Sequence, residues 1–319
     1  MSEGDAKIQT ITDKLTIVVP TKDRYPQVRR LLSSLAAQTR LPDEVLIVGE
    51  GFENAETVRE HPELNARFLD LPGLSISQAR NTGMAAARED AALIAFVDDD
   101  VEFEAQAIER MMTFWEQAPA DLAGAGFNFR NIPSRDTARK WALKPVRWAY
   151  RLFLGGYTRG EVLRSGFPTP IYPVSETLYV EWLETVAAVF RKPVLAQIKF
   201  DEFFAGYSYL EFLDFTYRIS RKFKLCVVHD ALVTHYASPI KNGYLLGKKQ
   251  VLNRIHFVRK HPELSLLRCL WALVMHAGFN LVVGLMLRDA GYFRRAKGNL
   301  AGLVQAARGR VEPVSGGIR

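Results

Sequence analysis

Three short apolar runs alternate with segments of helical period in the first hundred residues, and this alternation limits the fold more than any other feature of the chain. The runs occupy residues 15–19, 45–48 and 92–97, and they have the length and composition of buried strands rather than helices. Helical spacing of apolar residues follows Pro26 and returns over residues 75–88. Strands and helices in this order predict right-handed βαβ units. We therefore expect an α/β fold with a mainly parallel sheet flanked by helices.

Polar residues follow each apolar run. Residues 20–24 come after the first, Glu50 stands between two glycines after the second, and Asp98-Asp99-Asp100 follows the third. Ligands of open α/β sheets bind beyond the carboxyl ends of the strands, so these residues should converge on one crevice. Adjacent carboxylates at a sheet edge suit Mn²⁺ or Mg²⁺, with further ligands from substrate phosphates. Such an ion can neutralise the charge on a departing diphosphate.

Composition narrows the classes of partner. The formal net charge is +7, but no helix-turn-helix, RNP or zinc-finger pattern accompanies it, so we expect no nucleic-acid binding. Anionic lipid or a diphosphate substrate explains the basic excess more simply. Cys226 and Cys269 match neither a disulfide framework nor a zinc site, which favours a reducing compartment. Residues 1–14 lack a signal-peptide pattern, so we expect the catalytic half in the cytoplasm.

The second half of the chain has weaker periodicity. Residues 127–173 show no sustained period and indicate loops and short helices, whereas residues 209–222 have the pattern of an amphipathic helix. One or two strands are expected within residues 177–190, and another at residues 224–228. The expected parts are a first half (residues 1–125), a second half (126–243) and a C-terminal helical region (244–319).

Three ordered motifs resemble glycosyltransferase family 2, whose members have the GT-A fold. They are LTIVVPTKDR at residues 15–24, GLSISQARNTG at 73–83 and FVDDD at 96–100. The resemblance implies an inverting glycosyltransferase that uses a nucleoside diphosphate sugar together with Mn²⁺ or Mg²⁺. It makes residues 1–125 the nucleotide-sugar-binding half and residues 126–243 the acceptor-binding half of a GT-A domain. It places Pro20, Thr21, Arg24, Glu50, Arg80, Asp98 and Asp99 at the nucleotide sugar, and Asp98, Asp100 and His235 at the metal.

Three of these assignments have a second interpretation. Glu50 either replaces one of the paired aspartates of many family members or is a polar turn residue. His235 either lies near the metal and diphosphate or is a hydrogen-bonded packing residue. For Arg80 we favour a bidentate contact with a carboxylate or phosphate over an exposed position on a helix.

The general base has more than one candidate, because the chain departs from the family pattern. Residues 207–218 resemble the helix start that carries the base. Counted back from Arg218, Glu211 falls on the family's glutamate and Asp214 on its later acid, while Phe212 takes the place of the catalytic aspartate. Glu211 is our first candidate. Asp214 is either the base or an ion-pair partner of Arg218 at i+4, and loss or relocation of the base stays open.

An apolar segment lies within the basic C-terminal region. Residues 269–287 contain no charged side chain over 19 positions, near the length that spans a bilayer. Arg268 and Arg288 close the segment, and His276 and Asn280 fall in its middle. We favour a helix lying in the membrane interface over a membrane span or a core helix. A membrane surface is thus an expected partner, at the inner face of the cell membrane.

The leading functional hypothesis is transfer of a sugar from a nucleoside diphosphate donor to a saccharide or lipid-linked acceptor, in envelope polysaccharide or glycolipid synthesis. Phe212 motivates a second hypothesis, a noncatalytic partner that binds sugar nucleotides or lipid. A nucleotidyltransferase would also use carboxylate-bound Mg²⁺. It has less support, because no Gly-rich phosphate loop with a lysine follows the first strand.

Overall fold

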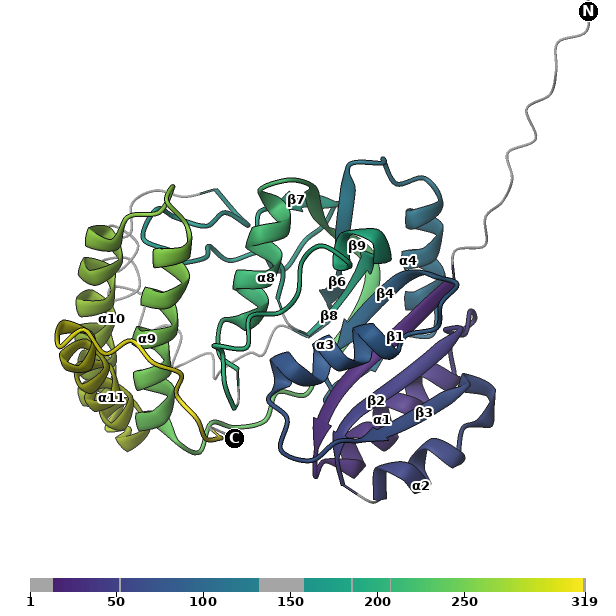
Figure 1. Ribbon diagram of the computed structural model, residues 1–319, viewed down its shortest axis with the longest axis horizontal. Coiled ribbons are helices and arrows are strands. Elements are labelled where there is room, and N and C mark those ends of the chain that lie inside the picture. Colours follow the sequence, from purple (N-terminus) through teal and green to yellow (C-terminus); the bar gives the residue numbers. More distant parts are fainter. Residues whose placement is uncertain (1–13, 52, 132–157, 185, 207, 318–319) are drawn as a thin grey trace, which may run out of the picture.

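The computed structural model describes residues 14–51, 53–131, 158–184, 186–206 and 208–317. A twisted nine-stranded sheet forms the centre, helices cover its faces, and three long C-terminal helices form a further layer at one side (Figure 1). The two faces of the sheet carry two hydrophobic clusters, one of which extends to the C-terminal helices.

The first half of the sheet is parallel, as the alternation of strands and helices predicts. Its strands follow the order β3-β2-β1-β4. The helix expected after Pro26 is α1, which buries Val28, Leu31, Leu32 and Leu35 at the predicted spacing. The elements are β1 (Lys14–Lys22), α1 (Tyr25–Ala36), β2 (Glu44–Glu50), α2 (Glu53–Arg59), the 3₁₀ helix η1 (Pro62–Leu64), β3 (Ala66–Asp70), α3 (Ile76–Ala86), β4 (Ala91–Val97) and α4 (Ala107–Glu116).

The second half makes the sheet mixed, which corrects the expectation of a mainly parallel sheet. β8 pairs antiparallel with both β4 and β6, because the chain re-enters the sheet from the end where β4 stops. β6 and β9 are parallel, while β5 and β7 pair antiparallel with β9. The elements are β5 (Val101–Phe103), β6 (Leu122–Phe129), β7 (Leu178–Val180), β8 (Ala187–Arg191), α7 (Lys192–Leu195), α8 (Glu211–Ser220) and β9 (Lys224–His235).

Strand β6 was missed by the sequence analysis. The expected boundary at 125/126 falls within it, and it overlaps the segment expected to form loops; residues 132–157 of that segment lie outside the described residues. All eight residues of β6 are buried, so it shows no alternation of apolar and polar residues. Gly124 and Gly126 leave room for larger neighbours, and a Cβ at Gly124 would lie 2.6 Å from the Phe190 ring. Because small residues take the place of larger apolar ones and every position is buried, the sequence of β6 lacks the pattern by which strands are predicted.

The C-terminal layer consists of α9 (Gly243–Lys260), α10 (Leu266–Leu287) and α11 (Ala290–Ala307). Helices α9 and α11 approach closely, since a Cβ at Gly298 would lie 2.0 Å from the Tyr244 carbonyl oxygen. Asn299 links all three helices by donating to the Gly247 carbonyl oxygen and accepting from Asn280. Cys269 and Leu273 of α10 belong to the main hydrophobic cluster. The layer is thus joined to the α/β domain by a shared core.

Candidate active site

One cleft, with a volume of about 1290 Å³, lies beyond the carboxyl ends of β1, β2 and β4. Helices α8 and α9 contribute to its opposite wall. Parallel strands end at the same edge of a sheet, so Thr21 and Asp99, 78 positions apart, meet at a hydrogen bond of 2.8 Å. The sequence-predicted site residues that border the cleft are Pro20, Thr21, Arg24, Glu50, Arg80, Asp98, Asp99, Glu211 and His235.

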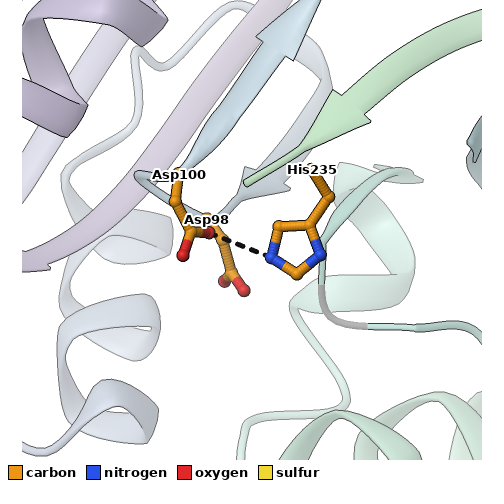
Figure 2. Close-up of side chains that lie close together, drawn as sticks. All are labelled: Asp98, Asp100 and His235. Atoms are coloured by element: carbon orange, nitrogen blue, oxygen red, sulfur yellow. Dashed lines mark hydrogen bonds and ion pairs between the residues drawn. The ribbon is translucent and has the colours of Figure 1, made fainter. Parts of the chain in front are cut away.

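Asp98, Asp100 and His235 form a compact group of possible metal ligands (Figure 2). Each offers one ligand atom, and these atoms lie within 4.8 Å of one another. The two aspartates follow β4, while His235 ends β9. Pairing of β5 with β9 sets Val101 opposite His235, and His235 Nε2 lies 3.1 Å from Asp100 Oδ1. The histidine was found by family resemblance, and the β5–β9 ladder explains how it reaches the aspartates.

The donor set fits a divalent cation. Carboxylate oxygens suit Mg²⁺ and Mn²⁺, and an imidazole is a common additional ligand for Mn²⁺-type ions. Arg80 donates to Asp98 Oδ1 at 2.9 Å, and Arg24 donates to Asp100 Oδ2 at 3.0 Å. Each arginine thereby fixes the orientation of one carboxylate, as outer hydrogen-bond donors do around metal ligands. The adjoining cleft leaves room for further ligands.

Asp99 lies between this group and the residues that follow β1. Its carboxylate accepts from Arg24 at 2.7 Å and from the Thr21 hydroxyl. Burial raises the pKa of Asp99 to about 7; the charges of Asp98 and Asp100 act in the same direction, and Arg24 opposes them. A buried carboxyl that sits between a guanidinium and a hydroxyl at the rim of β1 is suited to bind a polar ligand group.

Glu50 ends β2 between two glycines with positive φ. Gly49 is required there, since a Cβ would lie 1.7 Å from the Thr21 carbonyl oxygen. The Glu50 carboxylate pairs with Lys22 and accepts from the Gly73 N–H at 3.0 Å, and these contacts lower its pKa. Glu50 therefore ties the ends of β1 and β2 to the loop before α3 while still bordering the cleft.

Arg80 connects the group of possible metal ligands to Glu211. It is fully buried on α3 and donates to Glu211 Oε1 at 2.8 Å as well as to Asp98. Glu211, the first residue of α8, has a 3% exposed side chain and borders the cleft. Burial raises the pKa of Glu211, although Arg80 opposes the shift. A carboxylate with a raised pKa at the cleft wall has the properties of a general base.

Asp214 lies in a different environment. It is completely buried and is not among the residues bordering the cleft. Its carboxylate accepts from Arg218 at 2.9 Å and from Lys260 at 2.7 Å, and thereby joins α8 to α9. Burial opposes its ionisation, but His261, Arg218 and Lys260 together lower the pKa of Asp214. This geometry is that of an interhelical ion pair. Phe212 is buried among aromatic rings, including Phe190 and Phe200.

Several cleft residues escaped the sequence analysis. Glu184 borders the cleft just before β8, and burial raises its pKa to about 7. Lys249 of α9 does not itself border the cleft, but it is fully buried and donates to the carbonyl oxygen of Ala205, which does. Arg254 of the same helix and residues 315–317 also border the cleft. The only sequence signal for the basic pair was the charge excess of the C-terminal region, which we assigned to anionic lipid or a diphosphate substrate.

Comparison with known proteins defines the class. Residues 16–172 match the family model described as glycosyl transferase family 2. The uncharacterized glycosyltransferase YwdF of Bacillus subtilis (strain 168) is 35% identical over 132 residues, 40% of this chain and 48% of that protein. The uncharacterized glycosyltransferase EpsJ of the same organism is 30% identical over 117 residues, 35% of this chain and 33% of that protein. The matched part thus spans less than half of these relatives.

Solved structures share the fold. A mannosyltransferase from Pyrobaculum calidifontis, PcManGT, in complex with GDP-Man and Mn²⁺, superposes with a TM-score of 0.56 at 14% identity, over 95% of this chain and 88% of that one. GalNAc-T7 with UDP, GalNAc and Mn²⁺ gives 0.53 at 12% identity, over 71% and 44%. The fold is that of the GT-A glycosyltransferases. Through residues 16–172 the chain belongs to glycosyltransferase family 2.

Proposed function

We propose that the protein is a metal-dependent, inverting glycosyltransferase that moves a sugar from a nucleoside diphosphate to an acceptor hydroxyl. The observation that carries the proposal is the convergence of Asp98, Asp100 and His235 beside a cleft whose wall also holds Glu211. A donor with a diphosphate supplies the remaining metal ligands, and a carboxylate in the same cleft supplies the base.

The donor side of the cleft lies at the ends of β1 and β2. There, Thr21, Arg24, Glu50 and Asp99 offer hydroxyl, guanidinium and carboxylate groups to the nucleoside. A bound Mn²⁺ or Mg²⁺ would offset the charge that develops on the departing diphosphate. PcManGT, with the same fold, was solved with GDP-Man and Mn²⁺, which supports a sugar nucleotide and a divalent ion as ligands here.

The acceptor side lies along α8 and α9. Glu211 is positioned by Arg80 and takes the proton of the acceptor hydroxyl as the new bond forms. Burial keeps its pKa raised, so the carboxylate is a stronger base than one in water. We assign residues 1–125 to donor binding and 126–243 to acceptor binding. The region 244–319 adds helix α9 to the acceptor side.

Binding of the donor is the first test. Sugar nucleotides are screened for thermal stabilisation of the protein with Mn²⁺ and with EDTA. We expect at least one donor to raise the melting temperature with Mn²⁺ only. Asp100→Ala should lose this increase, whereas Asp121→Ala, an exposed aspartate paired with Lys224 outside the cleft, should keep it. Equal stabilisation of both variants would show that the aspartate group does not hold the metal.

The outer face of the C-terminal layer supports a membrane-surface location. Helix α10 is long and apolar enough to cross a membrane, yet only 33% of its most apolar window is buried. Its exposed side chains form a larger apolar surface than soluble proteins usually expose. They are Leu267, Leu270, Trp271, Val274, Leu281, Val282, Leu285 and Met286, together with Phe293, Leu300 and Val304 of α11. We call these residues the apolar face. In Figure 1, α10 and α11 lie at the edge of the molecule farthest from β2 and β3.

The excess of positive charge near the apolar face favours binding to an anionic lipid surface. Residues 264–311 contain seven Lys or Arg and one Asp. Lys297 lies on the same stripe of α11 as Phe293 and Leu300, at i+4 and i+7 spacing, and is exposed. Interfacial helices combine burial of an apolar face with attraction of basic residues to anionic headgroups. We therefore propose that the enzyme works at the inner face of the cell membrane on a lipid-linked or saccharide acceptor of the envelope.

A further inference from the structure

Arg254 is a buried basic residue that borders the cleft. It lies on α9 with a 3% exposed side chain. Nη1 donates to the Gly166 carbonyl oxygen, and the guanidinium stacks over the Phe167 ring with its central carbon 3.9 Å from the ring centroid. These contacts hold the plane of the guanidinium in one orientation. The remaining N–H groups are left for another partner.

No carboxylate among the described residues pairs with Arg254, in contrast to the other two arginines of the cleft. Arg24 contacts Asp99 and Asp100, and Arg80 contacts Asp98 and Glu211. The buried Nε of Arg254 has no hydrogen-bond partner within the described part of the chain, a feature that it shares with the Nε of Arg80. A buried cation without a counter-charge and a buried donor without an acceptor both cost folding free energy. Such a cost is typical of residues kept for a ligand.

The surroundings place this cation away from the donor. The cleft wall near Arg254 is apolar and includes Pro168, Trp182 and Leu213. The proposed nucleotide side, at the ends of β1 and β2, is polar. Phe167 is adjacent to Pro168, and Leu213 follows Glu211 on α8 by two positions. An acceptor whose hydroxyl approaches Glu211 would extend along this wall towards α9.

We propose that Arg254 binds an oxyanion carried by the acceptor, a phosphate or a carboxylate, through the terminal N–H groups at Nη1 and Nη2 that the described part of the fold leaves without a partner. A guanidinium edge matches two oxygens of either group, and burial among apolar side chains strengthens the contact. That the anion belongs to the acceptor rests on the proposed glycosyl transfer; binding of the anion does not. Arg254 then selects anionic acceptors, such as a phosphate-bearing lipid or saccharide or a uronic acid, over neutral ones.

The test uses thermal unfolding of the full chain in EDTA, at constant ionic strength set with NaCl. Methyl phosphate and glucuronate are the two probes. We expect one of them to raise the melting temperature of wild type saturably, by about 2–4 °C at ten times its Kd. Arg254→Gln and Arg254→Lys should lose the increase, since lysine keeps the charge but lacks the two-donor edge. Lys241→Gln, which removes an exposed cation from the same cleft, should retain it.

The probe that stabilises identifies the source of the anion. Methyl phosphate alone indicates a phosphate-bearing acceptor, and glucuronate alone indicates a uronic acid. Without probe, Arg254→Gln should melt at or above wild type, because it removes an uncompensated charge. A lower melting temperature or failure to fold would show that Arg254 serves the fold and would overturn the proposal. Wild type without a saturable increase, or Arg254 variants that keep it, would also overturn it. Absence of glycosyl transfer would not affect these readouts.

Discussion

Replacing Glu211 by glutamine removes the proposed proton acceptor with little change in shape. The amide oxygen of glutamine can still accept from Arg80, which also retains its contact with Asp98. Complete loss of one partner of a buried ion pair costs about 3–5 kcal/mol of stability, so keeping this hydrogen bond should limit the loss. Loss of a general base slows catalysis by about 10²–10⁴, equivalent to roughly 3–5 kcal/mol in the activation free energy. The damage should therefore appear in kcat rather than in folding.

The assay compares this variant with Asp214→Asn and Glu184→Gln. Turnover is measured at saturating donor, and donor affinity and the free energy of unfolding are measured in parallel. Asp214 joins Arg218 and Lys260 away from the cleft, so Asp214→Asn should lower stability and spare kcat. Glu211→Gln should spare donor affinity. A larger kcat loss in Asp214→Asn or Glu184→Gln than in Glu211→Gln would refute the assignment of the base.

Two further predictions concern titration and membrane binding. Burial raises the folded-state pKa of Glu184 to about 7. Wild type should therefore lose up to about 3 kcal/mol of stability relative to Glu184→Gln as the pH rises from about 4.5 to 8. Urea unfolding at both pH values checks this, and a stability difference between the two proteins that stays constant with pH would contradict it. Wild type should sediment with anionic vesicles at low salt and less at high salt. The double variant Leu281→Gln/Leu285→Gln should not, whereas Leu41→Gln, an exposed leucine of the first half, should behave as wild type. Wild type that stays in the supernatant would rule out the membrane role.

Local pattern was sufficient to predict the first half of the fold. Apolar runs of strand length and the helical spacing after Pro26 are encoded within short windows, and β1, β2, β4 and α1 follow them. Strand β6 was not predictable in this way, because Gly124 stands where a side chain would collide with Phe190 and Leu225 of neighbouring strands. The antiparallel entry of β8 likewise depends on partners distant in sequence.

The residues of the candidate site likewise fall into those that the sequence predicted and those that it did not. Residues at strand ends, such as Thr21 and Asp98, were predictable because the edge of a parallel sheet gathers them. Glu184 and Arg254 were not, since they reach the cleft only when the chain between β6 and β9 and helix α9 have packed. We attributed the basic residues after residue 241 to anionic lipid or a diphosphate substrate, and their sequence does not separate the two roles. Lys249 and Arg254 instead point inwards, and only burial distinguishes them from the exposed ones.

Turnover of a sugar nucleotide is the most direct test of the proposed activity. Purified protein is incubated with a panel of nucleoside diphosphate sugars in Mn²⁺ or in EDTA, and release of the nucleoside diphosphate is measured together with the anomeric configuration of the product. We predict release from at least one donor with Mn²⁺, inversion at the anomeric carbon, and loss of activity in EDTA and in Asp100→Ala. Donor binding without any release, in the presence of phosphate-bearing and uronic acid acceptors, would contradict catalysis and favour a noncatalytic sugar-nucleotide-binding protein.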